Sequence, residues 1–529
     1  MHSSLKKQKR NYSIMAESRT AKSVKNAQVS FFYYVVFMIL GFWSRKVFFD
    51  YLGSEVVGLE TTAGNLLGFL NLAELGIGMS VTYFLYKPLF AKEYEEINKI
   101  VALQGWIYRR VAYLVISGAI ILMCFFPLIF KGMTLPLWYA YAIFGVFLFN
   151  SLLGYFINYR QIVLNTDQKG YKVTRVTTGM NVALKIIQIL MLPLVPNPFL
   201  FYVGTSLFST IFTCWWLNHT ISKEYPWLKT KGYDGSKLYK SYPDIIKKTK
   251  QLFIHKITTV LLFQGTPFIM YAFSTLSVVA YYANYLLLVG KLKDVLNMVY
   301  SSMQAAVGSL IAEGDHEKII RRFWELYDSR FCIASIALVC VYFLSHPFIA
   351  LWLGEKYVLG QFILILLIID QSIYITRLTV DHYINGYGIF KDVWAPMAEG
   401  AINISAALGF GYLIGYEGVI LGSILSQVII ICIWKPILLF RDGLKLPVWN
   451  YFQRVVIRYM VIVADIIALS FLFDWILPHR FSSYLSFACY SFMAFIIISI
   501  VIFGEFLIFS QGTRDFFSRI SGIIHHKFK

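Results

Sequence analysis

The sequence predicts an all-α polytopic membrane protein with about fourteen transmembrane helices. Of its 529 residues, 58% are hydrophobic and only 15% are charged, whereas about a quarter of the residues of a soluble protein are charged. Apolar runs of roughly 20 residues recur along the chain, and each is long enough to cross about 30 Å of hydrocarbon as a helix. We expect crossings at residues 28–50, 58–86, 111–130, 137–158, 176–195, 199–219, 257–274, 277–300, 331–353, 361–383, 393–415, 418–439, 455–477 and 484–509.

The formal net charge of +19 follows an alternating pattern along the predicted loops. One set of loops contains most of the lysines and arginines, whereas the opposite set contains little beyond Lys131, Lys356 and Arg480. Because loops rich in lysine and arginine face the cytoplasm, we expect both termini there, and the even number of helices agrees. The positive charge then reflects topology and contact with anionic lipids, and we expect no nucleic-acid partner.

Six segments follow from this pattern. The longest connection, 222–256, is rich in lysine and separates two groups of six crossings. The second group restarts the first, because SEVVGLETTAGNLLGFL aligns with LSVVAYYANYLLLVGKL. We expect a basic cytoplasmic arm (1–27), an N-lobe (28–221), a basic linker (222–256), a C-lobe (257–440), two accessory helices (441–510) and a cytoplasmic tail (511–529).

The sequence offers no pattern for catalysis, metal binding or a cofactor. All six cysteines fall inside predicted crossings and none has C-x-x-C spacing. Every predicted exterior loop is short, so none is long enough to form a catalytic domain. We therefore expect a protein that is not an enzyme and that has no metal or cofactor.

Several separated motifs, in order, resemble one family. They are YLGSEVVGL, NLLGFLNLAELGIGMSVTYFLYKPL, AAVGSLIAEGDHEKI, HPFIALWLGEKYVL, NGYGIFKD and YEGVILGSILSQ. The sequence is similar to the polysaccharide-transporter family, the O-antigen repeat-unit flippases of the multidrug/oligosaccharidyl-lipid/polysaccharide flippase superfamily. The resemblance implies two six-helix lobes in a V around a central cavity, with two additional C-terminal helices. Relatives often carry an acidic residue in the seventh helix, where this sequence has Gly265-Thr266-Pro267.

The resemblance also implies a cargo and a location. The cargo would be an undecaprenyl-pyrophosphate-linked oligosaccharide, moved from the inner to the outer leaflet of the bacterial cytoplasmic membrane. Such a cargo requires cations for the pyrophosphate, polar groups for the sugars and a gap between helices for the prenyl tail. Membrane lipids, a polymerase and other polysaccharide-assembly proteins are the expected partners.

Five cations inside predicted crossings are candidates for binding the pyrophosphate, because an ionised side chain in hydrocarbon needs a partner or a functional role. Lys185 and Arg45 have no acid three or four residues away, and we expect Lys185 near the membrane midplane. Lys291 can pair with Asp294 on the same helix, whereas Lys293 is freer but nearer the headgroups. Arg377 is the fifth candidate, with an internal salt bridge to Asp381 as the structural alternative.

Four acids in the crossings complete the candidate site. Glu74 has no cation nearby in the sequence, so it either pairs with a cavity cation or titrates as a coupling site. Asp370, Asp381 and Glu399 are further candidates for pairing or coupling.

Two other classes of protein remain open on the sequence. A multidrug exporter of the same superfamily would need an acidic, aromatic cavity for organic cations, whereas the candidates here are mainly cationic. A membrane-embedded polysaccharide polymerase or glycosyltransferase would need a sizeable exterior loop, which the predicted topology lacks.

Overall fold

The structure is a computed structural model that describes residues 2–74, 76–301, 303–389, 392, 394–476, 481 and 483–527. Side chains are not described for residues 2–25, 27, 73, 251–265, 295, 297–301, 304–306, 309, 312 and 520–527, which include most of the predicted N-terminal arm and part of the predicted tail. Every regular element in the described ranges is a helix, so the predicted all-α class is confirmed.

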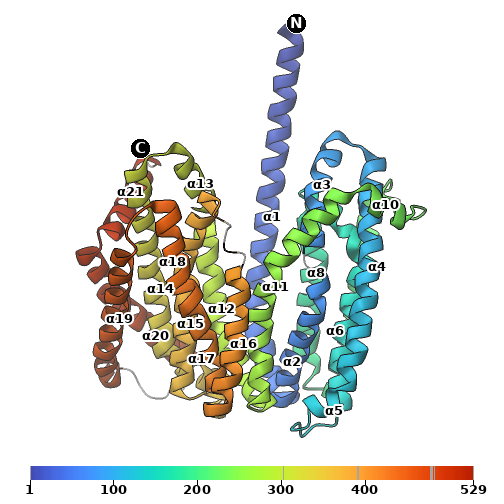
Figure 1. The fold of residues 1–529 in the computed structure, drawn as a ribbon. Coiled ribbons are helices and arrows are strands. Elements are labelled where there is room, and N and C mark those ends of the chain that lie inside the picture. Colours follow the sequence, from blue (N-terminus) through green and yellow to red (C-terminus); the bar gives the residue numbers. More distant parts are fainter. Residues whose placement is uncertain are drawn as a thin grey trace. The chain divides into compact units, whose positions relative to one another are not determined.

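The chain divides into two compact units, each a bundle of helices (Figure 1). Unit 1 contains Met1–Phe268 and Thr275–Ala280, and unit 2 contains Ile269–Ser274 and Tyr281–Lys529. Long helices run roughly alongside one another within each bundle, as packing of apolar helices in a membrane requires.

Unit 1 is built from the first eleven α-helices and two short 3-10 helices. They are α1 (His2–Tyr51), α2 (Ser54–Leu70), η1 (Asn71–Glu74), α3 (Ile77–Ala91), α4 (Tyr94–Cys124), α5 (Phe126–Ile129), α6 (Trp138–Phe156), η2 (Asn158–Gln161), α7 (Ile162–Thr166), α8 (Gly170–Met191), α9 (Pro198–Glu224), α10 (Gly235–Ser241) and α11 (Pro243–Ala272).

The second predicted crossing, expected as one helix over 58–86, is broken in the middle. Helix α2 ends at Leu70, η1 follows as a 3-10 turn, and Gly76 takes a left-handed conformation (φ 89°) before α3 begins. Glycine adopts this conformation without a steric penalty. The break brings polar residues of η1 into the interior of unit 1.

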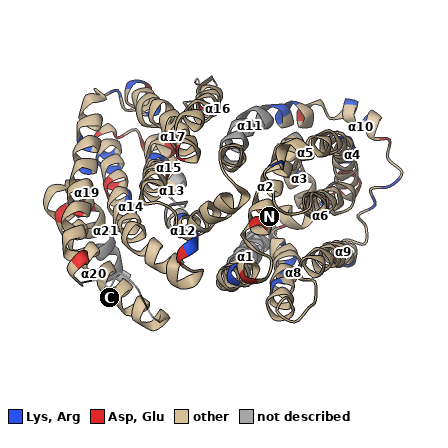
Figure 2. Cartoon of the chain, turned by 90° about the horizontal axis from the view of Figure 1, so that it is seen from below, with Lys and Arg blue, Asp and Glu red and all other residues tan. Residues whose placement is uncertain are grey.

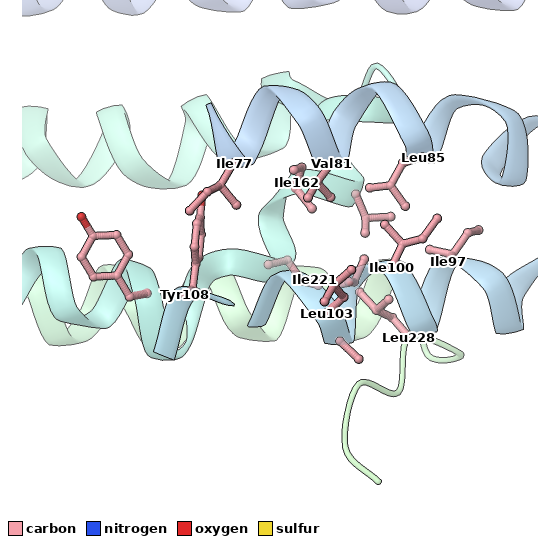
Figure 3. Packing of buried hydrophobic residues seen from close by; sticks show 14 of the residues in the cluster. Ile77, Val81, Leu85, Ile97, Ile100, Leu103, Tyr108, Ile162, Ile221 and Leu228 are labelled. Atoms are coloured by element: carbon pink, nitrogen blue, oxygen red, sulfur yellow. The ribbon is translucent and has the colours of Figure 1, made fainter. Parts of the chain in front are cut away.

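A cluster of buried apolar side chains joins α3, α4 and the segments packed against them (Figure 3). Val81 and Leu85 of α3 lie against Ile97 and Leu103 of α4. Ile245 of α11 belongs to the same cluster and is only 1% exposed. The start of α11 is therefore anchored in the core of unit 1 through this side chain.

Unit 2 contains the remaining helices, two of which widen into π-helical segments. They are α12 (Leu276–Ser301), α13 (Met303–Glu313), α14 (His316–Trp352), η3 (Glu355–Tyr357), α15 (Gln361–Tyr387), α16 (Trp394–Ile414), α17 (Tyr416–Gln427), η4 (Val428–Trp434), α18 (Lys435–Leu438), η5 (Leu439–Leu444), α19 (Trp449–Ile476), α20 (Tyr484–Phe509) and α21 (Gln511–Lys527). The segments α17, η4, α18 and η5 follow one another without a break.

Helices α16 and α17 approach closely because two glycines of α17 face the backbone of α16. A Cβ on Gly418 would lie 2.1 Å from the carbonyl oxygen of Phe410, and one on Gly422 would lie 2.3 Å from the nitrogen of Ala407. Small residues allow this kind of backbone contact between membrane helices.

Ten helical segments in the described part of the chain are long and apolar enough to cross a membrane. They are Gln28–Tyr51, Tyr94–Cys124, Trp138–Phe156, Pro198–Glu224, His316–Trp352, Gln361–Tyr387, Trp394–Ile414, Tyr416–Leu444, Trp449–Ile476 and Tyr484–Phe509. The other four predicted crossings fall on α2–α3, α8, α11 and α12, which are interrupted, more polar or only partly described. The count of fourteen is therefore not confirmed, although charged residues are sparse along the helices (Figure 2).

Candidate functional site

Unit 1 holds two of the predicted cations close to one another. Helices α1 and α8 pack along each other, and the Lys185 ammonium on α8 donates a hydrogen bond to the Ser44 hydroxyl on α1 at 3.3 Å. The same ammonium lies 5.2 Å from the ring centre of Phe48 and 5.7 Å from that of Phe37. No carboxylate of the described residues lies within ion-pair distance of Lys185.

Arg45 lies beside this lysine on α1. Its guanidinium donates to the carbonyl oxygen of Ala280, in the same unit, at 3.3 Å and lies 5.5 Å from the ring centre of Phe49. Glu60 of α2 interacts electrostatically with Arg45, with Lys185 and with Tyr202 of α9. We call Arg45, Lys185, Glu60 and Tyr202 the cation cluster.

The cation cluster lies near one end of the bundle. Arg45 is roughly six residues before the end of α1, Glu60 roughly six after the start of α2, and Lys185 roughly six before the end of α8, which corresponds to about 9 Å of helix in each case. The expectation that Lys185 lies at the midplane depended on a crossing over 176–195. Since α8 begins at Gly170 and ends at Met191, Lys185 belongs to the last third of the helix.

Unit 2 places polar side chains along one face of α15. They follow one another at intervals of four, three and four positions, which is the spacing of a single helix face: Asp370, Tyr374, Arg377 and Asp381. Asp370 accepts hydrogen bonds from Gln371 at 2.7 Å, Ser423 at 3.2 Å and Gln427 at 2.5 Å. Its carboxylate is therefore held by neutral donors.

Asp381 is held instead by two cations. The Lys435 ammonium lies 2.8 Å from one carboxylate oxygen, and the Arg377 guanidinium lies 3.4 Å from the other. The predicted Arg377–Asp381 pair is therefore present. Glu399 of α16 is only 6% exposed and interacts electrostatically with Arg377 and Lys435.

Lys435 occupies an unusual position in the backbone. It begins the short helix α18, with the π-helical segments η4 before it and η5 after it. Segments of π-helix inside longer helices are rare and frequently occur at functional sites.

The two remaining predicted cations also lie in unit 2. The Lys293 ammonium is 4.4 Å from the ring centre of Tyr374, and the Arg377 guanidinium is 4.9 Å from the same ring. Lys291 pairs with Asp294 at 3.7 Å, as its spacing predicted. We call Lys293, Asp370, Arg377, Asp381, Glu399 and Lys435 the unit 2 cluster.

Glu74 lies in a different part of unit 1. It accepts a hydrogen bond from the Tyr108 hydroxyl at 3.2 Å, and Tyr155 is close enough to interact with it. Within the described residues the partners shown for Glu74 are tyrosines, and its pairing with a cation or its role in coupling stays a prediction. Glu74 lines a cavity of about 600 Å³ between α3, α4, α6 and η2, which also contains Gln104.

Sequence reasoning missed three members of these clusters, which are Glu60, Tyr202 and Lys435. Glu60 interacts electrostatically with Arg45 and Lys185, which lie on other helices, so no local spacing indicated it. Lys435 contacts Asp381 from 54 positions away, so no local spacing indicated it either. Tyr374, the ring beside Lys293 and Arg377, could have been found from its spacing of four positions from Asp370 and three from Arg377. Among the described residues, no group of three or more histidine, cysteine, aspartate or glutamate side chains could hold a metal ion.

The long apolar helices of the described residues indicate a multi-pass membrane protein. No protein-family model and no curated protein matches the sequence. A solved structure of the lipid II flippase MurJ in an inward closed conformation matches 92% of this chain and 100% of its own, with 15% sequence identity and a TM-score of 0.62. An inward-facing multidrug resistance MATE family transporter of the MOP superfamily matches 77% of this chain and 95% of its own, with 14% identity and a TM-score of 0.55. The chain therefore has the fold of these two transporters.

Proposed function

We propose that the protein translocates undecaprenyl-pyrophosphate-linked oligosaccharides, the repeat units of a polysaccharide, from the inner to the outer leaflet of the bacterial cytoplasmic membrane. Translocation proceeds by alternating access, with both termini in the cytoplasm. Nothing is cleaved or formed, so the protein needs no nucleophile or general base and is not an enzyme.

The observation that carries the proposal is the cation cluster. Two of its members, Arg45 and Lys185, are cations inside an apolar bundle, and both interact electrostatically with Glu60. Ionisable side chains inside a membrane segment are costly and are typical of a substrate pathway. Arg45 and Lys185 supply charge-assisted donors to the oxygens of a pyrophosphate.

The unit 2 cluster plays a second part in the same cycle. Its three cations and three carboxylates balance in number, so we propose that Lys293 and Arg377 exchange partners between Asp370, Asp381 and Glu399 as the cargo headgroup moves. Lys291 stays on its own helix with Asp294 and contributes positive charge near the headgroup region. Membrane lipids surround the protein, and a polymerase and other assembly proteins receive the product.

The multidrug exporter is a second candidate, favoured by one observation. The cavity around Glu74 is acidic and aromatic, which suits an organic cation. The lysines and arginines of the cation cluster and the unit 2 cluster favour an anionic cargo, because their positive charge repels a cationic drug.

Deletion of the gene tests the proposal in cells. We expect the deletion strain to lose surface polysaccharide and to accumulate lipid-linked oligosaccharide, because synthesis continues on the inner leaflet while export stops. Mass spectrometry of extracted lipids measures the accumulation. A strain with normal polysaccharide and altered resistance to cationic drugs would contradict the flippase and support the exporter.

A further inference from the structure

The cavity around Glu74 carries an inference that rests on the proposed function. We propose that it is a carbohydrate subsite, which binds one neutral or N-acetylated sugar of the glycan while the cation cluster holds the pyrophosphate. The cavity, of about 600 Å³, is formed entirely within unit 1.

The lining has the chemistry of a sugar site. It contains six amide or hydroxyl side chains, five tyrosines and one carboxylate, and no lysine or arginine among the described lining residues. Sugar hydroxyls need many donors and acceptors, and their apolar C–H faces pack on aromatic rings. A pyrophosphate would find no cation here.

One buried acceptor in the lining lacks a partner. Gln104 is only 2% exposed, and its side-chain oxygen has no hydrogen-bond partner among the described residues. Buried acceptors of this kind are costly unless a water or a ligand donates to them. In the proposed subsite, rotation of the Gln104 side chain toward the cavity brings this oxygen to a sugar hydroxyl or N-acetyl N–H.

The break in the second predicted crossing, at η1, forms another part of the cavity wall. Asn71 of η1 accepts hydrogen bonds from Ser151 at 2.9 Å and Tyr155 at 2.8 Å, which tie the break to α6. Glu74, three residues later, is bonded to Tyr108 on α4. Interrupted membrane helices commonly line substrate sites, since the irregular backbone is tolerated beside a cavity.

The alternative occupant is an organic cation, attracted by Glu74 and the tyrosine rings. The sugar is favoured because the amides and hydroxyls greatly outnumber the single carboxylate, which already accepts a bond from Tyr108. A hydrophobic cation would leave those amides and hydroxyls without partners.

Binding to the full-length protein in lipid nanodiscs tests the proposal. The probes are methyl glucoside, methyl N-acetylglucosaminide, methyl glucuronide and tetraphenylphosphonium, measured by calorimetry. We expect the two uncharged glycosides to bind and the glucuronide to bind more weakly, because Glu74 repels its carboxylate.

Two variants and one control locate the site. Gln104→Leu removes the unpaired acceptor, and Gly154→Leu fills the cavity at a position where an added Cβ meets nothing within 4 Å. Each should weaken glycoside binding at least about tenfold. Gln188→Leu is the matched control, because Gln188 is equally buried at 2% but lies outside the cavity, bonded to Thr205 and Ser206.

Three results would overturn the carbohydrate subsite. The first is no binding of either uncharged glycoside, and the second is glycoside binding that survives Gly154→Leu. The third is that Gly154→Leu abolishes the binding of tetraphenylphosphonium but not that of the glycosides. If the protein flips lipid-linked glycan in a Lys185-dependent manner but binds no glycoside, the subsite is refuted and the proposed function stands. If the protein binds glycosides in the cavity but moves no lipid-linked glycan, the subsite stands and the proposed function is refuted.

Discussion

Replacement of Lys185 by alanine is expected to abolish surface polysaccharide while leaving the amount of protein in the membrane unchanged. The ammonium has a serine and two aromatic rings as neighbours, and it shares Glu60 with Arg45. Its removal therefore costs the folded protein little, because no ion pair is broken. The cargo, in contrast, loses a charge-assisted hydrogen bond of about 1.5–3 kcal/mol to its pyrophosphate, so we expect polysaccharide to fall at least about tenfold.

Two further variants make the Lys185 result specific. Lys185→Arg keeps the positive charge and should retain much of the export. Lys172→Ala removes a lysine from the same helix, but one that pairs with Glu224 near the start of α8, and it should leave export normal. Arg45→Ala should resemble Lys185→Ala. Normal polysaccharide in both alanine variants would remove the cation cluster from the mechanism.

The second large effect is expected at Asp381. Asp381→Leu leaves Lys435 and Arg377 without the carboxylate that joins them, and their own side chains are only 21% and 24% exposed. Breaking a buried pair by removing one partner typically costs about 3–5 kcal/mol. We therefore expect a clear fall in the melting temperature of the purified protein and lower yield in the membrane.

A double variant separates the ion pair from general packing. Asp381→Leu combined with Lys435→Met removes both charges of the shortest contact, so it should be more stable than Asp381→Leu alone. Thermal unfolding in detergent, followed by tryptophan fluorescence, measures all three proteins. A melting temperature for Asp381→Leu within error of the parent would contradict the structural importance of this pair.

The fold class could be predicted from the sequence because it depends on local properties. The length of an apolar run determines whether a helix can span the membrane, and i,i+3 or i,i+4 spacing determines which charges can pair on one helix. The Lys291–Asp294 and Arg377–Asp381 pairs were predictable for this reason.

The candidate site was less predictable because its partners come from different helices. Lys185 meets Ser44 across 141 positions, and Asp381 meets Lys435 across 54. Neither contact has a signature in local spacing. The position of Glu74 could not be predicted for the same reason, because its partner Tyr108 lies on another helix, α4. Their contact also depends on the break at η1, and the apolar run from 58 to 86 gives no sign of that break.

Transport by the purified protein in liposomes tests the central claim most directly. Vesicles containing a fluorescently labelled undecaprenyl-pyrophosphate oligosaccharide are probed with a membrane-impermeant quencher of the labelled headgroup. We predict that wild-type protein exposes the inner-leaflet glycan much faster than protein-free vesicles do, and that Lys185→Ala, reconstituted to the same density, does not. Wild-type vesicles that expose the glycan no faster than empty ones, or transport that is unchanged by Lys185→Ala and Arg45→Ala, would contradict the account.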